Sequence, residues 1–473
     1  MHKLFLTLLL LFSVSFIFAI PQNGVSSSNR LSLRESDINI ITKDYDLNGD
    51  TLMIPKGCVL KFENGSISNG VIYADYVFPV EASLTQIFRN VKFLVRNSGT
   101  FMVKAEWFGV DRQNDDSENA ENLQMLLNSN RNLHVLFQDG IYRFNIVHPV
   151  MASGQYVLTG ESSGFFSEIP RTNFLITGKP MVPTFFLTLL TNRSTIKDIA
   201  FSSMSGEDST ILGNIGCVFI KDASNDPGNI DSAVDGCLFA HVGCPLKAYG
   251  RGLSITNCRF QQGGGVVIKQ SHTKSDNYTQ KPPYDGRGLF VDNIRVHWLY
   301  RGCQASGEYN GFGGKDYTFM TIQHNEEEEG STFFGVMINN VYADGACQFM
   351  DCDSDINCFT LTNVFCPLPI GNFLHFKRNA SNIIVSKVTA EHFYHRSPSH
   401  FVHFATFNGN MEYCIFTDNI FGVMKDALIA VEGTQQEVKN CIIANNIVKG
   451  CSELITNSQN VINLNVENNI IDK

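Results

Sequence analysis

Nine positively charged side chains lie close together in the middle of this 473-residue sequence. They are Lys247, Arg251, Arg259, Lys269, Lys274, Lys281, Arg287, Arg295 and Arg301. The same window holds three acids, Asp276, Asp285 and Asp292, so it is strongly positive within a chain whose net charge is −10. A positive surface on an acidic protein concentrates an anionic ligand. We therefore predict that this window binds an acidic partner.

The window also contains the groups needed to remove a proton next to a carboxylate. That chemistry requires a cation to neutralise the carboxylate, a base to take the proton and an acid to protonate the leaving oxygen. The candidates for the base are Lys269 and His272, and Tyr278 can serve as base or acid. The candidates for holding the carboxylate are Arg251, Arg287 and Arg295. The alternative is that these are solvated loop charges.

A second group of candidate residues is acidic. Asp351, Asp353 and Asp355 alternate along the chain, and an extended strand places alternate side chains on one face. Three carboxylates on one face predict a calcium site, or the acid and base of a glycoside hydrolase. The alternative is that the three acids surround a solvated turn.

A short phrase that recurs from about residue 196 predicts how these residues are held. It runs apolar, polar, Asn or Gly, any residue, apolar, as in Ile255–Phe260 and Val466–Ile470. The steps from Asn340 to Asn363, Lys387, and from Asn419 to Asn446 and on to Asn469 are 23, 24, 27 and 23 residues. Each phrase is typical of a strand, a one-residue bend in the left-handed conformation that Asn tolerates, and a second strand.

These repeats predict a right-handed parallel β-helix with one coil per repeat. Stacked coils would align their asparagines in hydrogen-bonded ladders inside the cylinder. A leucine-rich repeat requires a leucine lattice that the sequence lacks, and a β-sandwich requires turn signals every 8–12 residues or so. The thirteen cysteines are odd in number and scattered, which favours small buried hydrophobic residues over a disulfide framework or a zinc site.

The sequence before the repeats divides into three parts. Residues 1–19 have a basic start, an apolar run and a small final residue, which predicts a secretory signal peptide; an uncleaved membrane anchor is the alternative. Residues 20–105 predict a small N-terminal β module, and residues 106–473 the β-helix domain. Asp115 and Glu118 are a helix-start pair before Leu123, Leu126 and Leu127, which predicts a helix that caps the cylinder. No later segment is apolar enough to span a bilayer.

Several of these segments together resemble a known family. The order Trp107-Phe108-Gly109, Asp115-Asp116, a helix and Gly140-Ile141-Tyr142 is similar to the segment that opens the cylinder of pectate-lyase-superfamily β-helices. Residues 45–109 resemble the N-terminal part of secreted β-helix proteins of gut Bacteroidetes. The resemblance implies the fold and a carbohydrate setting more strongly than it implies a reaction.

With the basic window, the resemblance implies an extracytoplasmic polysaccharide lyase that cleaves an acidic, uronate-containing glycan by β-elimination, secreted, periplasmic or at the cell surface. A glycoside hydrolase on the same scaffold and a non-catalytic surface glycan-binding protein are the alternatives. The motifs of polygalacturonases are missing, and Arg396-Ser397-Pro398 lacks the second Arg of pectate lyases. Only 17% of residues are charged and the net charge is negative, which argues against nucleic acid as a partner. Calcium dependence and oligomeric state stay open.

Overall fold

A computed structural model of the chain gives the arrangement of its strands. It describes residues 31–96, 99–163, 171–203, 213–221, 229–269, 288–297, 299, 312, 317–323, 332–344, 348–367, 369, 371–391, 401–422, 424, 427–433, 435–456 and 460–472. The predicted signal peptide lies outside these residues.

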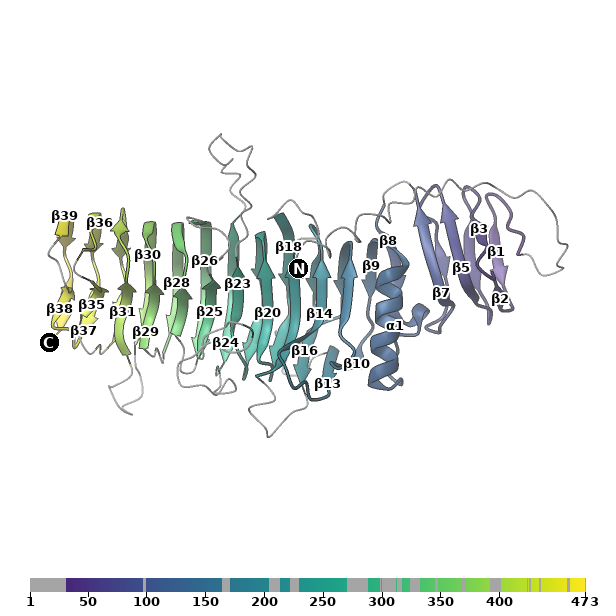
Figure 1. Cartoon of the computed structure of the whole chain (residues 1–473), viewed down its shortest axis with the longest axis horizontal. Helices are drawn as coiled ribbons and strands as arrows, with labels where there is room; N and C mark the ends of the chain where they lie inside the picture. The colour runs from purple at the N-terminus through teal and green to yellow at the C-terminus, as the bar shows by residue number, and fades with distance from the viewer. Residues whose placement is uncertain are drawn as a thin grey trace, which may run out of the picture.

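The N-terminal module is itself a small stack of parallel strands (Figure 1). Its strands are β1 (Ile38–Ile41), β2 (Tyr45–Asp46), β3 (Thr51–Met53), β4 (Val59–Phe62), β5 (Ile67–Ala74), β6 (Val80–Glu81) and β7 (Phe88–Val95). The bends fall at Asn48, Asn69 and Asn90, which all have positive φ. Asn90 Nδ2 donates to Asn69 Oδ1 at 3.2 Å, so the module follows the same coil rule as the rest of the chain.

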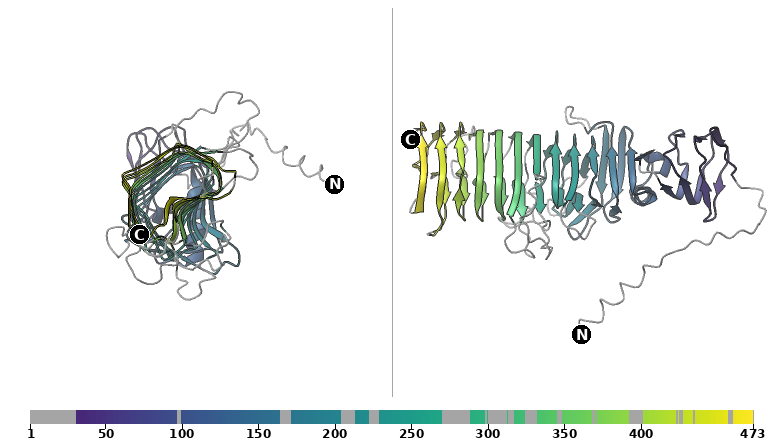
Figure 2. Two further views of the ribbon diagram at one scale, coloured as in Figure 1. Left: turned by 90° about the vertical axis from the view of Figure 1, so that its left-hand side faces the viewer. Right: turned by 90° about the horizontal axis from the view of Figure 1, so that it is seen from above.

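The larger part of the chain is a parallel β-helix, as predicted, and its coils superpose when viewed along the axis (Figure 2). Each coil contributes one strand to an 11-stranded sheet and, in most coils, two strands to a 22-stranded sheet. The 11-stranded sheet contains β11 (Val150–Ser153), β14 (Thr184–Leu190), β17 (Ile215–Lys221), β20 (Cys244–Tyr249), β23 (Val266–Lys269), β25 (Thr318–Gln323), β27 (Gln348–Cys352), β29 (Gly371–Phe376), β31 (Phe401–Phe407), β35 (Ala427–Val431) and β38 (Glu453–Ile455).

The 22-stranded sheet wraps around the remaining sides of the cylinder. It contains β8 (Phe101–Lys104), β9 (Asn132–Leu136), β10 (Gly140–Asn145), β12 (Gln155–Thr159), β13 (Thr172–Thr177), β15 (Thr195–Lys197), β16 (Ala200–Ser203), β18 (Asn229–Asp235), β19 (Leu238–Ala240), β21 (Arg251–Thr256), β22 (Arg259–Gln261), β24 (Leu289–His297), β26 (Thr332–Asp344), β28 (Asp355–Cys366), β30 (Ala380–Ala390), β32 (Met411–Glu412), β33 (Ile415–Thr417), β34 (Ile420–Phe421), β36 (Val438–Ala444), β37 (Ile447–Lys449), β39 (Val461–Glu467) and β40 (Ile470–Asp472).

The predicted asparagine ladders exist, but only one of them lies inside the cylinder. Asn419 donates to Asn446, and Asn446 to Asn469, at 2.9 Å each in the interior. In these coils the positive φ falls one residue earlier, at Asp418, Asn445 and Asn468. Asn340 and Asn363 instead occupy the bend themselves, and their amides bond on the solvent side. A residue at the bend points outward, and its successor points inward.

Stacked aromatic rings fill the core. Phe201, Phe239 and Phe260 lie 5.3 Å apart from ring to ring in successive coils, and all three are buried. This packing accounts for the abundance of Phe in the sequence, since offset stacking of neighbouring rings adds to the gain from burial. Ten of the eleven cysteines that the structure describes are buried as well, as small core residues.

The predicted helix lies between the N-terminal module and the large cylinder (Figure 1). α1 (Asp116–Ser129) follows the short helix η1 (Ala105–Phe108), and its buried side includes Leu123, Leu126 and Leu127. The Asp115 side chain accepts a hydrogen bond of 2.7 Å from the Glu118 amide, which confirms the helix start. β8 precedes η1 and already pairs with β9, so the large sheet begins before the helix that covers its first coil.

Replacing Asp115 by alanine is expected to lower the free energy of unfolding by about 1 kcal/mol, because the helix loses the acceptor for one of its first amides. Equilibrium unfolding in urea measures the change. The exposed Glu121, later in the same helix, is the control, and Glu121→Ala is expected to change stability by less than about 0.5 kcal/mol. Equal effects of the two changes would show that the cap does not stabilise this helix.

Candidate functional site

Polar side chains collect on the outer face of the 11-stranded sheet, which we call the polar face. The inward positions of its central strands are apolar, among them Ile268, Ile322, Cys352 and Phe376. The alternate positions therefore point outward. One outward row contains, strand by strand, Lys247, Val267, Thr321, Asp351, His375 and Thr406. A second row contains Lys221, Tyr249, Lys269, Gln323, Asp353, Lys377, Asn408 and Glu432.

A buried carboxylate is the centre of this face. Asp351 lies on β27 between Met350 and Cys352, which point into the core, and its side chain is 0% exposed. One carboxylate oxygen is 2.9 Å from His375 Nδ1, and the other accepts a hydrogen bond of 2.9 Å from Lys377 Nζ. A buried carboxylate is costly unless it is paired and hydrogen-bonded, and the two cationic partners from β29 meet both needs.

The hydrogen bonds fix the protonation of His375. Asn408 Nδ2 donates to Glu432 Oε2 at 3.0 Å, so Asn408 Oδ1 is the atom that faces His375 Nε2, at 2.9 Å. Nδ1 faces the carboxylate of Asp351. Both ring nitrogens therefore face acceptors, and both must carry a proton to donate. His375 thus fits its surroundings as an imidazolium that can give up a proton.

The surroundings of this cluster suit a ligand-binding surface. His375 and Lys377 retain 15% and 26% of their side-chain exposure. The hydroxyl of Thr406, which pairs with His375 across the sheet, is buried without a hydrogen-bond partner among the residues described. Buried polar groups normally have partners, so a ligand oxygen over His375 would complete this set.

Cys352, the residue after Asp351, is no candidate nucleophile. Its side chain points into the core, and burial raises the pKa of its thiol to about 12. The thiol therefore stays protonated at neutral pH, whereas nucleophilic attack requires a thiolate.

The three aspartates do not fit the predicted calcium site. Asp351 is bound by His375 and Lys377, and Asp353 Oδ1 is 3.2 Å from Arg378 Nε. β27 ends at Cys352 and β28 begins at Asp355, so the strand alternation assumed for the three carboxylates stops at a bend. Asp355 instead accepts from the Asn379 amide. Cations next to two of the three carboxylates repel Ca²⁺, and no group of three possible ligands occurs among the described residues.

The structure brings one basic candidate to the polar face and leaves two elsewhere. Lys269 ends β23 and points outward there, two strands from β27. Arg251 begins β21 and Arg295 lies on β24, both in the 22-stranded sheet on other sides of the cylinder. His272, Tyr278 and Arg287 lie outside the described residues.

Sequence reasoning missed His375, Lys377, Asn408 and Glu432. A usable signal exists, because His375 follows Asp351 by 24 residues, which is one repeat. Side chains one repeat apart occupy the same position in adjacent coils. The charged residues were compared along the chain instead of across repeats.

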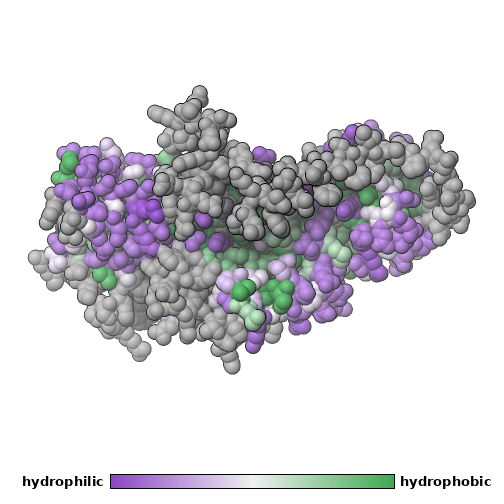
Figure 3. Space-filling view, in the orientation of Figure 1, coloured by the Kyte–Doolittle hydropathy of each residue, from purple (hydrophilic) through white to green (hydrophobic). Residues whose placement is uncertain are grey.

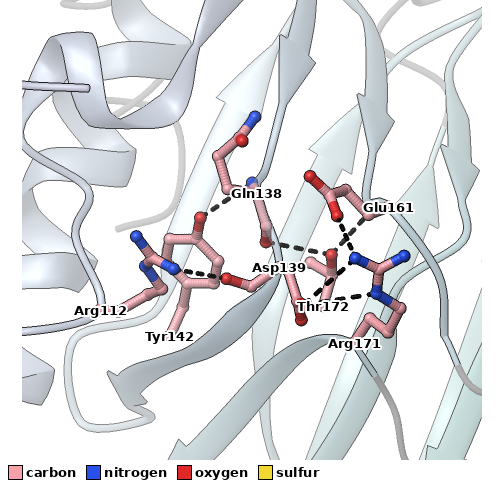
Figure 4. Close-up of polar contacts among 7 residues, drawn as sticks. All are labelled: Arg112, Gln138, Asp139, Tyr142, Glu161, Arg171 and Thr172. Atoms are coloured by element: carbon pink, nitrogen blue, oxygen red, sulfur yellow. Dashed lines mark hydrogen bonds and ion pairs between the residues drawn. The ribbon is translucent and has the colours of Figure 1, made fainter. Parts of the chain in front are cut away.

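A different polar cluster sits at the N-terminal end of the large cylinder (Figure 4). Arg171 Nη2 is 3.3 Å from Asp139 Oδ2 and 3.0 Å from Glu161 Oε2, and Arg112 Nη1 donates to the Asp139 carbonyl at 2.7 Å. Beneath them the buried Tyr142 hydroxyl donates to Glu106 at 2.6 Å. Burial raises the pKa of Tyr142 far above its usual value. Acids and cations here satisfy one another, so this cluster ties the first coils together.

None of the helices within the described residues has the length and apolar character needed to cross a membrane.

Comparisons with known proteins found no matching family model and no match among curated proteins. Among solved structures, the A-module of mannuronan C-5 epimerase AlgE6 from Azotobacter vinelandii is 10% identical, with 78% of this chain and 99% of that chain covered and a TM-score of 0.42. The catalytic unit of a GH87 α-1,3-glucanase from Streptomyces thermodiastaticus is 13% identical, with 80% and 68% covered and a TM-score of 0.31. The surface protein and adhesin PfbA of Streptococcus pneumoniae is 11% identical, with 79% and 99% covered and a TM-score of 0.35. Similarity at this level carries no argument about activity, and the β-helix assignment rests on the strand pairing described above.

Proposed function

We propose that the protein is an extracytoplasmic enzyme that cleaves an acidic, uronate-containing polysaccharide by β-elimination on the polar face. The observation that supports this most is the pairing of one fully buried carboxylate, Asp351, with two cations that stay partly exposed, His375 and Lys377. This arrangement presents positive charge and a transferable proton to the outside while the compensating negative charge is buried.

Each member of the cluster has a proposed role in the elimination. Lys377 neutralises the uronate carboxylate, which stabilises the charge that develops when the C5 proton leaves. A base takes that proton, the C4–O bond breaks, and a double bond forms between C4 and C5. His375 gives a proton to the leaving oxygen, and Asp351 orients its ring and stabilises its charge. His272 and Tyr278 stay the candidates for the base.

The hydrolase alternative has less support from the same residues. A glycoside hydrolase needs a carboxylic acid that donates a proton and a second carboxylate across the scissile bond. Asp351 and Asp353 are each engaged by a cation, which favours the ionised form of a carboxyl group and opposes proton donation.

Ultraviolet absorbance of unsaturated uronate products tests the proposal. The mature protein is incubated with pectate, alginate, chondroitin, heparan and hyaluronan, with calcium and with a chelator. We expect absorbance to rise on at least one substrate and, since the aspartates do not fit calcium, to rise equally with the chelator. New reducing ends without absorbance would establish hydrolysis instead. Silence in both assays would contradict the enzyme and leave a glycan-binding protein.

A further inference from the structure

Three side chains on the N-terminal half of the polar face form a compact cationic cluster around one aromatic ring. Lys221, Tyr249 and Lys269 pair in register on the neighbouring strands β17, β20 and β23. The Nζ atoms of Lys221 and Lys269 lie 5.5 and 5.6 Å from the centre of the Tyr249 ring. Cations at this distance are attracted by the face of an aromatic ring, so the tyrosine holds the two ammonium groups on either side of itself.

A third lysine supports the cluster from the adjacent row. Lys247 is largely buried, and its Nζ donates to the Phe312 carbonyl at 2.8 Å. Burial lowers the pKa of Lys247, and the nearby ammonium of Lys269 lowers it further. In the part of the chain that the structure describes, none of Lys221, Lys247 and Lys269 forms an ion pair with a carboxylate. Lys377, Lys439 and Lys449, by contrast, all do.

The cluster lies at a defined distance from Asp351 and its partners. Three strand steps separate β23 from β29, and five separate β17 from β29. Strands in a sheet are about 4.8 Å apart, so Lys269 and Lys221 lie on the order of 14 and 24 Å from the Lys377 strand along the cylinder axis. Those distances exceed one sugar ring, so a group bound here belongs to a different sugar from the one at His375.

We propose that Lys221, Tyr249 and Lys269 form a separate acidic-sugar subsite, in which the ammonium groups bind the anionic group of one sugar and the phenol ring packs on the sugar face. The glycan then lies along the cylinder axis, across the strands. This inference rests on the proposed function for the sugar at His375. It also makes Lys269 a binding residue and not the base that its sequence position suggested.

Native gel electrophoresis through each acidic polysaccharide tests the subsite by binding alone. Lys221→Ala and Lys269→Ala are compared with Lys92→Ala, a change of equal charge at an exposed strand position of the N-terminal module. We expect the wild type and Lys92→Ala to be retarded by the same glycan, and the two subsite variants to need about tenfold more of it, as the loss of one charged hydrogen bond implies. Carboxylate-only and sulfated glycans in separate gels distinguish the two anionic groups.

The outcomes separate the subsite from the reaction. Retardation of the subsite variants equal to that of Lys92→Ala, or no retardation of the wild type by any glycan, would overturn the subsite, whatever the absorbance assay shows. Where turnover is measurable, the subsite predicts a higher KM and an unchanged kcat for Lys269→Ala. A collapse of kcat with unchanged retardation would instead make Lys269 the base and overturn the inference.

Discussion

Replacing His375 by glutamine is expected to lower kcat by about 10²–10⁴, the usual contribution of a positioned proton donor. Glutamine retains a polar side chain next to Asn408 but has no titratable proton to give to a leaving oxygen. The measurement is the initial rate of absorbance increase on the substrate identified in the panel. Because His375 lies at the sheet surface and keeps 15% exposure, the variant should fold, and its melting temperature provides the check.

The chain offers a matched control for this change. His297 Nδ1 lies 3.6 Å from Asp344 Oδ2 in the 22-stranded sheet, so it is also a histidine beside an aspartate on an outer face. Burial lowers the pKa of His297, and the nearby Arg259 lowers it further. His297→Gln is therefore expected to leave kcat within about twofold, since surface changes away from the site have small effects. Equal rates in the two variants would remove His375 from the reaction and shift attention to Arg295 and its neighbours.

The sequence predicted the fold because its signal repeats. Each coil needs a bend that only a few residue types tolerate, and the bend recurs every 21–27 residues or so, as a solenoid requires. The structure differs from the prediction at the residue level. The asparagine of the motif sits at the bend in some coils, such as Asn363, and one residue after it in others, such as Asn446. A one-residue offset reverses whether a side chain faces inward or outward, and no spacing argument resolves it.

The site was less predictable than the fold. Alternation along the chain correctly singled out Asp351 as an outward acid, but its partners come from the next coil. Counting one repeat forward leads from Asp351 to His375, whereas the charge count along residues 247–301 joined residues of different sheets, such as Lys269 and Arg295. In a solenoid, neighbours in space are one repeat apart. The assignment of Arg251 and Arg295 to one groove ignored that geometry.

The interior asparagine ladder is expected to be the largest single polar contribution to stability in the C-terminal coils. Asn446 is fully buried and makes four hydrogen bonds: its Oδ1 accepts from the amide and the side chain of Asn419, and its Nδ2 donates to Phe416 and Asn469. Asn446→Leu leaves two buried donors of Asn419 and one buried carbonyl without partners. At 1–3 kcal/mol for each such group, we expect the free energy of unfolding to fall by about 3–5 kcal/mol.

Equilibrium unfolding in urea, combined with hydrogen exchange, measures this loss and locates it. Asn465→Ala is the control, because Asn465 is exposed and contacts only Glu467 among the described hydrogen bonds; its effect should stay below about 0.5 kcal/mol. Coils of a solenoid contact only their neighbours, so exchange in Asn446→Leu should rise in β36–β40 and stay unchanged in β9–β16. A loss below about 1 kcal/mol would show that the buried ladder fixes the position of the bends without stabilising the coils, since unsatisfied groups in a dry core cannot be that cheap.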